Sequence, residues 1–265
     1  MDKDNKTFWE HLEDMRGMLI RSAIYLLIFT IIAFCFKDFI FNNIILSPKG
    51  SNFITNRLLC KVGKLLSLKS LCIGNNDLNI INIQLSGQFM MHIYISFMSA
   101  IVLSSPLIII EIWKFIKPAL YKEEHQKIKS VVIICILLFL FGVFVSYYLI
   151  VPLTINFFAS YTVSDTVTNQ ISLSSYIHTI FSVIITTGVV FEMPVFVFFL
   201  TKIGILNPSF LRKNRKYAIV IILAISSVIT PPDIFSQLLV SIPLFLLYEI
   251  SIIASKYAIP KDLKG

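Results

Sequence analysis

The chain has 265 residues, of which 56% are hydrophobic and only 14% are charged, and its mean hydropathy is +0.81. A soluble domain carries about a quarter charged residues, so this composition excludes a soluble protein and indicates an integral membrane protein. The formal net charge of +8 does not require a nucleic-acid partner, because basic residues gathered in loops beside a membrane explain it equally well.

The N-terminal segment predicts a helix that continues into a first membrane span. Thr7 and Glu10 match a capping box, so a helix is expected to begin near Phe8. It runs into the apolar stretch 18–36, which has about the ~20 residues that a helix needs to cross the hydrocarbon core. Arg21 lies one turn inside this stretch, where its side chain can snorkel back to the surface. No small-residue cleavage site follows, so the span is expected to stay in the membrane as an anchor.

Residues 37–87 form a long polar interval without a complete span. Residues 58–66 within it are apolar at helical spacing with lysines between, which predicts a short helix on the membrane surface. Cys60 and Cys72 both fall in this interval, which faces an oxidising compartment if the membrane is a bacterial inner membrane. Spacing alone leaves two interpretations open, a disulfide that closes the loop or two separate thiols.

Three further spans are expected at about 89–110, 130–150 and 175–200, with a loop at 151–172. Between the first two lies the island 111–125, where five lysines of the interval 111–129 alternate with Trp113, Phe115 and Tyr121. Lys and Arg accumulate on the cytoplasmic side of membrane proteins, and Trp and Tyr lie at the headgroup level. This island therefore predicts a cytoplasmic loop on the membrane surface.

The last two spans are expected at 217–229 and 234–254, on either side of the turn 230–233. The first has 13 residues, or roughly 20 Å of helix, which is too short to cross a bilayer of normal thickness unaided. The pair must be antiparallel, and the short helix implies local thinning of the bilayer or tilt.

The distribution of Lys and Arg predicts the orientation. Seventeen of them fall in the N-terminal segment, the two loops at 111–129 and 202–216, and the C-terminal tail, against six in the interval 37–87. We therefore predict an all-α integral membrane protein, a single polytopic domain over 1–265 with six transmembrane helices and both termini in the cytoplasm.

No catalytic constellation is found. The four histidines, at positions 11, 92, 125 and 178, are scattered over different segments, so we expect no metal site. Neither a Gly-rich phosphate loop nor a nucleophile elbow is present, and the aspartates lie outside the spans. The chain is expected to be neither an enzyme nor a protein that holds a cofactor.

Glu192 stands out because it lies near the centre of the span 175–200. An ionised side chain there costs roughly 2.5–3.5 kcal/mol, so an intramembrane acid is by default a functional candidate. Pro194 cannot donate to the carbonyl of Val190, and Gly188, one turn away, leaves room for a polar partner. The other interpretation is a protonated acid bonded to a neighbouring helix. Glu249, nearer the cytoplasmic end of the last span, is a second and weaker candidate.

Acidic residues also gather on the predicted cytoplasmic side. Glu10 and Asp14 share a helix face, and with Glu13, Glu123 and Glu124 they form an acidic cluster on a surface otherwise dominated by lysine. Carboxylates can bind guanidinium groups through two parallel hydrogen bonds. The simpler interpretation is that these acids pair with nearby lysines, and the residues by themselves leave both open.

Five ordered segments of the sequence form one recognisable pattern: Phe8-Trp-Glu-His-Leu-Glu-Asp-Met-Arg16, Ser105-Pro106 with the run from Trp113 to Glu124, Phe191-Glu-x-Pro-Val195, Leu211-Arg-Lys-x-Arg-x-Tyr217, and Thr230-Pro-Pro-Asp-x-Phe-Ser-Gln237. Through these segments the chain resembles the TatC family, the polytopic core of the twin-arginine protein translocase, over nearly its whole length. The match in the last outer turn includes Pro231 and Asp233. Short fifth and sixth helices and a glove-like concave bundle are features that this resemblance implies.

The resemblance implies a role as receptor for the twin-arginine signal peptides of folded cargo in the bacterial inner membrane. Acids matching Asp14 and Glu124 form the recognition site in that family, and the matching segments add Glu13, Arg16, Pro118, Tyr121 and Glu123. Glu192 matches an intramembrane acid that contacts a polar residue of a partner. The implied partners are single-span TatA/TatB-type subunits and further copies of the chain in the surrounding lipid bilayer, with no nucleic acid. The implied energy source is the proton gradient.

An alternative from a different class is a proton-coupled secondary transporter of a small solute, with Glu192 as the coupling carboxylate. Inverted repeats would support it, and the sequence contains none that we recognise.

Overall fold

The structure is a computed structural model that describes residues 8–50, 53–65, 79–117, 128–161, 164, 169–229 and 234–258. The chain divides into two compact units, one formed by Met1–Lys37 with His92–Leu137 and the other by Asp38–Met91 with Leu138–Gly265. Two long helices cross the boundary between the units, so each unit is described by itself.

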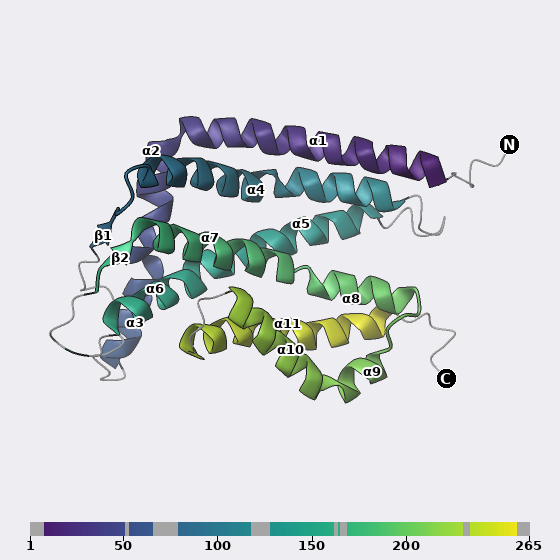
Figure 1. The fold of residues 1–265 in the computed structure, drawn as a ribbon. Helices are drawn as coiled ribbons and strands as arrows, with labels where there is room; N and C mark the ends of the chain where they lie inside the picture. Colours follow the sequence, from purple (N-terminus) through teal and green to yellow (C-terminus); the bar gives the residue numbers. More distant parts are fainter. Residues whose placement is uncertain are drawn as a thin grey trace. The chain divides into compact units, whose positions relative to one another are not determined.

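The first unit is built on the antiparallel pair of α1 (Phe8–Cys35) and α4 (Gly87–Ile116), which lie side by side in Figure 1. At one end of the pair the His92 ring stacks on Phe34 with 4.0 Å between the centroids, and His92 Nε2 lies 3.2 Å from the Phe34 carbonyl oxygen. At the other end Arg21 reaches Glu111. Helix α4 continues through Ile116, past the expected end at residue 110, so the first part of the predicted surface loop is helical.

The second unit contains most of the remaining elements. In chain order these are α2 (Lys37–Phe39), the π-helix η1 (Ile40–Ile45), the 3-10 helix η2 (Ser47–Lys49), α3 (Ile54–Leu65), β1 (Ile80–Ile81), the π-helix η6 (Ser146–Ile150), α6 (Val151–Ser160), β2 (Ile171–Ser172), α7 (Leu173–Val190), α8 (Met193–Lys202), α9 (Pro208–Lys213), α10 (Arg215–Ile229) and α11 (Ile234–Ala258). Helix α5 (Ile128–Val145) begins in the first unit and ends in the second. The two short strands pair in parallel, with Ile80 opposite Ile171.

Buried polar side chains anchor the segment after α1 to the middle of α6 and the start of α7. The Asn156 side chain donates to Asn56 Oδ1 at 2.9 Å and to the Pro152 carbonyl at 2.7 Å, and both asparagines are buried. The Tyr176 hydroxyl donates to the Ile45 carbonyl at 2.8 Å. Because buried amides are costly without partners, these bonds make the first part of the interval 37–87 an ordered structure. The helix expected at 58–66 is present as α3, which begins four residues earlier.

The third span is longer than expected. Helix α5 passes through η6 into α6, so one helical run of 32 residues extends from Lys129 to Ser160, where a loop was expected from residue 151. Pro152 does not end the run. Its missing N–H leaves the Tyr148 carbonyl, one turn earlier, without its usual helical donor, and this carbonyl accepts from the Thr55 hydroxyl of α3 instead.

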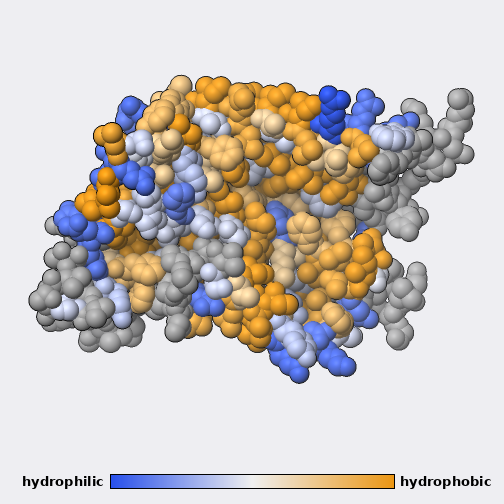
Figure 2. All heavy atoms as spheres, viewed as in Figure 1, coloured by the Kyte–Doolittle hydropathy of each residue, from blue (hydrophilic) through white to orange (hydrophobic). Residues whose placement is uncertain are grey.

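Five helices among the described residues are long and apolar enough to span a membrane: Trp9–Cys35, Gly87–Ile116, Lys129–Ser160, Leu173–Lys202 and Gln237–Ala258. Helix α10, the predicted short fifth helix, has 15 residues. The sixth helix, α11, has 25 residues and continues from Ile234 to Ala258, past the predicted end at residue 254. Figure 2 shows mostly hydrophobic side chains along the visible face of α1. The exposed apolar residues of this helix include Leu19, Ile24, Leu27 and Ile31.

Candidate functional site

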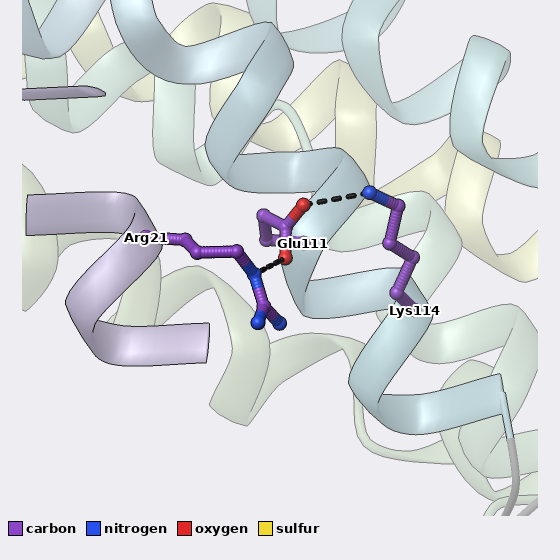
Figure 3. A network of polar contacts seen from close by, with 3 residues as sticks. All are labelled: Arg21, Glu111 and Lys114. Atoms are coloured by element: carbon purple, nitrogen blue, oxygen red, sulfur yellow. Dashed lines mark hydrogen bonds and ion pairs between the residues drawn. The ribbon is translucent and has the colours of Figure 1, made fainter. Parts of the chain in front are cut away.

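The end of the first unit where α1 begins and α4 ends holds a network of three charges (Figure 3). Glu111 of α4 is almost completely buried, with 3% of its side chain exposed. Arg21 Nε of α1 donates to Glu111 Oε2 at 2.6 Å, and Lys114 Nζ donates to Oε1 at 2.7 Å. Each carboxylate oxygen therefore has its own cation, and we call these three residues the Glu111 triad.

The triad explains how a carboxylate can be buried beside a membrane. A buried ion is stable only when it is paired and hydrogen-bonded, and the two cations remain about half-exposed, at 51% and 62% of their side chains. Glu111 was not among the site residues predicted from the sequence. The signal that could have found it is an acid directly after one apolar run and an arginine one turn inside another.

A second contact ties the same helices closer to the start of α1. The His11 ring meets the Phe115 ring edge-on, with 6.3 Å between the centroids and 78° between the planes. Trp113, between Glu111 and Phe115 in sequence, is also buried. The two helices are thus in contact both at Arg21 and, ten residues earlier, at His11.

The structure describes some of the predicted signal-binding residues. Glu13, Asp14 and Arg16 lie on α1 between its two contacts with α4, and all three are exposed. The other predicted members of this site, Pro118, Tyr121, Glu123 and Glu124, lie outside the described residues, so their placement stays a prediction.

Glu192 lies at a break in the fourth predicted span. Helix α7 ends at Val190 and α8 begins at Met193, with Glu192 as the N-cap residue of α8 and its side chain half-buried. Its carbonyl accepts from the amides of Val195 and Phe196 at 3.0 and 3.2 Å. Since Pro194 has no N–H to continue the bonding of α7, the acid lies where the regular helix is interrupted.

A close approach of α5 and α7 holds this break in place. A Cβ atom on Gly142 of α5 would lie 2.8 Å from Phe191 Cγ and 3.0 Å from the Gly188 Cα. A Cβ on Gly188 would lie 3.0 Å from Phe139 Cε2. The space that Gly188 was expected to leave for a polar partner is therefore occupied by α5, and the expectation for that glycine is wrong.

Glu249 pairs with a cation near the cytoplasmic end of the second unit. Arg215 Nη2 of α10 donates to Glu249 Oε2 of α11 at 2.8 Å, and both side chains are partly exposed. The neighbouring Tyr248 hydroxyl donates to the Leu211 carbonyl of α9 at 2.7 Å. These bonds join α9, α10 and α11 at one end.

The remaining predicted positions lie in the outer segments. Cys60 of α3 is disulfide-bonded, but Cys72 lies outside the described residues, so the Cys60–Cys72 pairing stays a prediction. Pro231 and Asp233 of the last outer turn are likewise outside the described part of the chain. Within that part, no group of three or more His, Cys, Asp or Glu side chains could hold a metal ion.

Comparison with known proteins gives one consistent family. Residues 10–243 match the family described as Sec-independent protein translocase protein (TatC). The chain is similar to the protein of that name from Blattabacterium sp. subsp. Periplaneta americana, with 40% identity over 262 residues that cover 98% of both chains. It is also similar to the protein of that name from Escherichia coli K12, with 35% identity over 65% of this chain and 67% of that protein. A solved structure, "Crystal Structure of Twin Arginine Translocase Receptor- TatC", superposes with a TM-score of 0.72 at 31% identity and covers 94% of this chain and 99% of that chain.

Proposed function

Since the chain belongs to the TatC family and is thus a multi-pass inner-membrane component of the twin-arginine translocase, we propose that the acids beside the Glu111 triad bind the arginine pair of the signal peptide. Glu13 and Asp14 of α1 would bind one guanidinium group, and Glu124, eight residues after the end of α4 at Ile116, would bind the other. The observation that supports this proposal most is the pairing of Arg21 with Glu111. It ties the acid-bearing start of α1 to the end of α4 that leads into the segment carrying Glu124.

The chemistry of two arginine side chains fits a site made of carboxylates. A carboxylate accepts a guanidinium through two parallel N–H···O bonds, a geometry that an ammonium group cannot reproduce. The side chains of Glu13 and Asp14 are exposed on α1. The exposed apolar residues of α1, such as Leu19 and Ile24, offer a surface for the apolar part of the signal.

The test is the affinity of a synthetic twin-arginine signal peptide for the protein in lipid nanodiscs. We expect Glu124→Gln and Asp14→Asn each to weaken binding by about tenfold or more, the effect of losing a charge-assisted hydrogen bond. A twin-lysine peptide should bind more weakly than the twin-arginine peptide to the unmodified protein.

The matched control is Asp38→Asn, which removes a carboxylate from α2, directly after the opposite end of α1. It should leave the affinity unchanged. Equal affinity for both peptides, together with no loss in Glu124→Gln, would refute the receptor proposal.

We further propose that Glu192 is where a single-span partner subunit of the translocase contacts this chain. The break between α7 and α8 supports this role, because a half-buried acid at an interrupted helix can accept from a polar side chain of a second helix. Photocrosslinking from position 192 should capture a single-span subunit, and the control position 203 should not. For Glu249, the bond from Arg215 supports a structural role at the cytoplasmic end as well as the predicted partner contact.

The remaining partner proposals are the folded cargo that the signal peptide carries and further copies of this chain in the complex. The secondary-transporter alternative gains no support from the comparisons.

A further inference from the structure

We propose that Glu111 is a positioning residue for signal recognition: by pairing with Arg21 it sets the register of α1 against α4 and so the spacing of the arginine-binding acids. This inference rests on the proposed receptor function and adds a residue that the recognition site itself does not contain. Glu111 is buried, so it acts through α1 rather than by touching the peptide.

The division of the two carboxylate oxygens makes Glu111 a connector between helices. Lys114 is one turn further along α4 and occupies Oε1 at 2.7 Å, which leaves Oε2 for Arg21 of α1 at 2.6 Å. Arg21 thus binds through Nε to one oxygen of a carboxylate whose other oxygen is already taken. Arg21 can therefore keep this bond at only one position along α4. A shift of α1 by one residue would move Arg21 about 1.5 Å along the helix axis, away from Oε2.

Gly17 supports this arrangement from within α1. A Cβ atom at Gly17 would lie 3.3 Å from Arg21 Nη1 and 4.0 Å from Cζ, so the guanidinium lies back along the helix over the preceding turn. Side chains of a helix lean toward its N-terminus, and glycine leaves the most room for one that does. Because the contact is with the far end of a flexible side chain, the guanidinium needs to shift by only a few tenths of an ångström if a methyl group is added at Gly17.

The contact between His11 and Phe115 gives α1 a second fixed point. Glu13 and Asp14 lie between His11 and Arg21, so the two contacts with α4 bracket the acids of α1. On α4, Glu111 and Phe115 lie within seven residues of Pro118, where the segment carrying Glu124 begins. A change in register would therefore alter the separation between the two groups of acids, and two guanidinium groups on adjacent residues tolerate little change in that separation.

The test compares peptide affinity and helix register in the full-length protein in nanodiscs. The probes are a twin-arginine signal peptide and its twin-lysine counterpart, against Glu111→Gln, Arg21→Gln, the double variant and the conservative Arg21→Lys. We expect Glu111→Gln to lower twin-arginine affinity by about tenfold, because small displacements of binding groups have effects of this size or larger. Twin-lysine affinity should change much less, so the ratio of the two affinities falls. Arg21→Lys should keep most of the affinity ratio that Arg21→Gln loses. The double variant should resemble either Glu111→Gln or Arg21→Gln alone.

Register is measured separately by disulfide crosslinking between His11→Cys and Phe115→Cys, without any peptide. The crosslinking pair removes the His11–Phe115 ring contact both in the protein that keeps Glu111 and in the one with Glu111→Gln. A difference in rate between these two proteins therefore reports the effect of the Glu111 triad alone. We expect slower crosslinking of this pair in Glu111→Gln, and an unchanged rate in Lys117→Gln, which removes a cation beyond the end of α4.

The outcomes separate the two proposals. If the unmodified protein prefers twin-arginine while Glu111→Gln keeps both the affinity ratio and the crosslinking rate, the positioning role of Glu111 is refuted and the receptor function stands. The positioning role is also refuted if Glu111→Gln lowers the affinity for both peptides equally and Arg21→Lys binds them no better than Arg21→Gln, since that result describes residues needed only for folding. If the unmodified protein shows no preference and Glu124→Gln has no effect, the receptor function fails and the positioning role fails with it.

Discussion

Replacing Gly142 with alanine tests the packing that holds the break between α7 and α8. The added methyl group would lie 2.8 Å from Phe191 Cγ, 2.9 Å from Phe191 Cβ and 3.0 Å from the Gly188 Cα. Carbon atoms in contact are usually about 3.5–4.0 Å apart, so each of these contacts is at least about 0.5 Å too short. Two of the three atoms are a backbone atom and a side-chain base atom, which cannot move without moving α7.

Two opposing effects set the size of the loss. Overpacking costs about 1–3 kcal/mol, and replacing a helical glycine with alanine returns about 1 kcal/mol. Because the short contacts involve atoms that cannot rotate away, we expect a net destabilisation of about 1–2 kcal/mol. Gly17→Ala is the matched control, since its Cβ would meet only the end of the Arg21 side chain, at 3.3 Å.

The assay is thermal unfolding of both variants in the same detergent, together with photocrosslinking of a single-span subunit from position 192. Gly142→Ala should unfold at a lower temperature than the unmodified protein and give less crosslinked product, whereas Gly17→Ala should unfold at the same or a higher temperature. A Gly142→Ala variant as stable as Gly17→Ala would show that α5 and α7 do not pack as described.

Two further changes test contacts in the second unit. Asn156→Ala leaves the buried Asn56 Oδ1 without the hydrogen bond that it accepts at 2.9 Å, so we expect a loss of about 1–3 kcal/mol in thermal or denaturant unfolding; a variant as stable as the unmodified protein would argue against the buried amide pair. Glu249→Gln breaks an ion pair whose side chains are 49% and 32% exposed, so the unfolding free energy should fall by no more than about 1 kcal/mol. A larger loss would mean that the Arg215–Glu249 pair is better shielded from water than its exposure indicates.

The long apolar runs predicted the spans because a helix in a bilayer must satisfy its own backbone and present apolar side chains over a fixed length. The ends of the helices were harder to predict. Helix α4 continues to Ile116, because Glu111 can be buried within it when two cations pair with its carboxylate. The sequence prediction ended the span before Glu111, because a charged residue is normally placed outside an apolar run. The helical run also continues from α5 to Ser160, past residue 151, where a loop was predicted to begin.

The residues that the sequence did not reveal depend on contacts between distant segments. Glu111 and Arg21 are 90 positions apart, and nothing in either segment alone shows that they pair. Gly142 is one of nine glycines, and only the packing of α5 on α7 distinguishes it from the others. Glu192, in contrast, was identified because a carboxylate within an apolar run is costly wherever its partner lies.

The account depends most on where the arginine pair of a signal peptide binds. A photoreactive residue placed directly beside the two arginines of a signal peptide can report this position in native membranes. We predict crosslinks to positions 13–14 of α1 and to the segment 118–124, with the yield reduced by Glu111→Gln. Crosslinks that form instead at positions 37–39, at the opposite end of α1, would contradict the account.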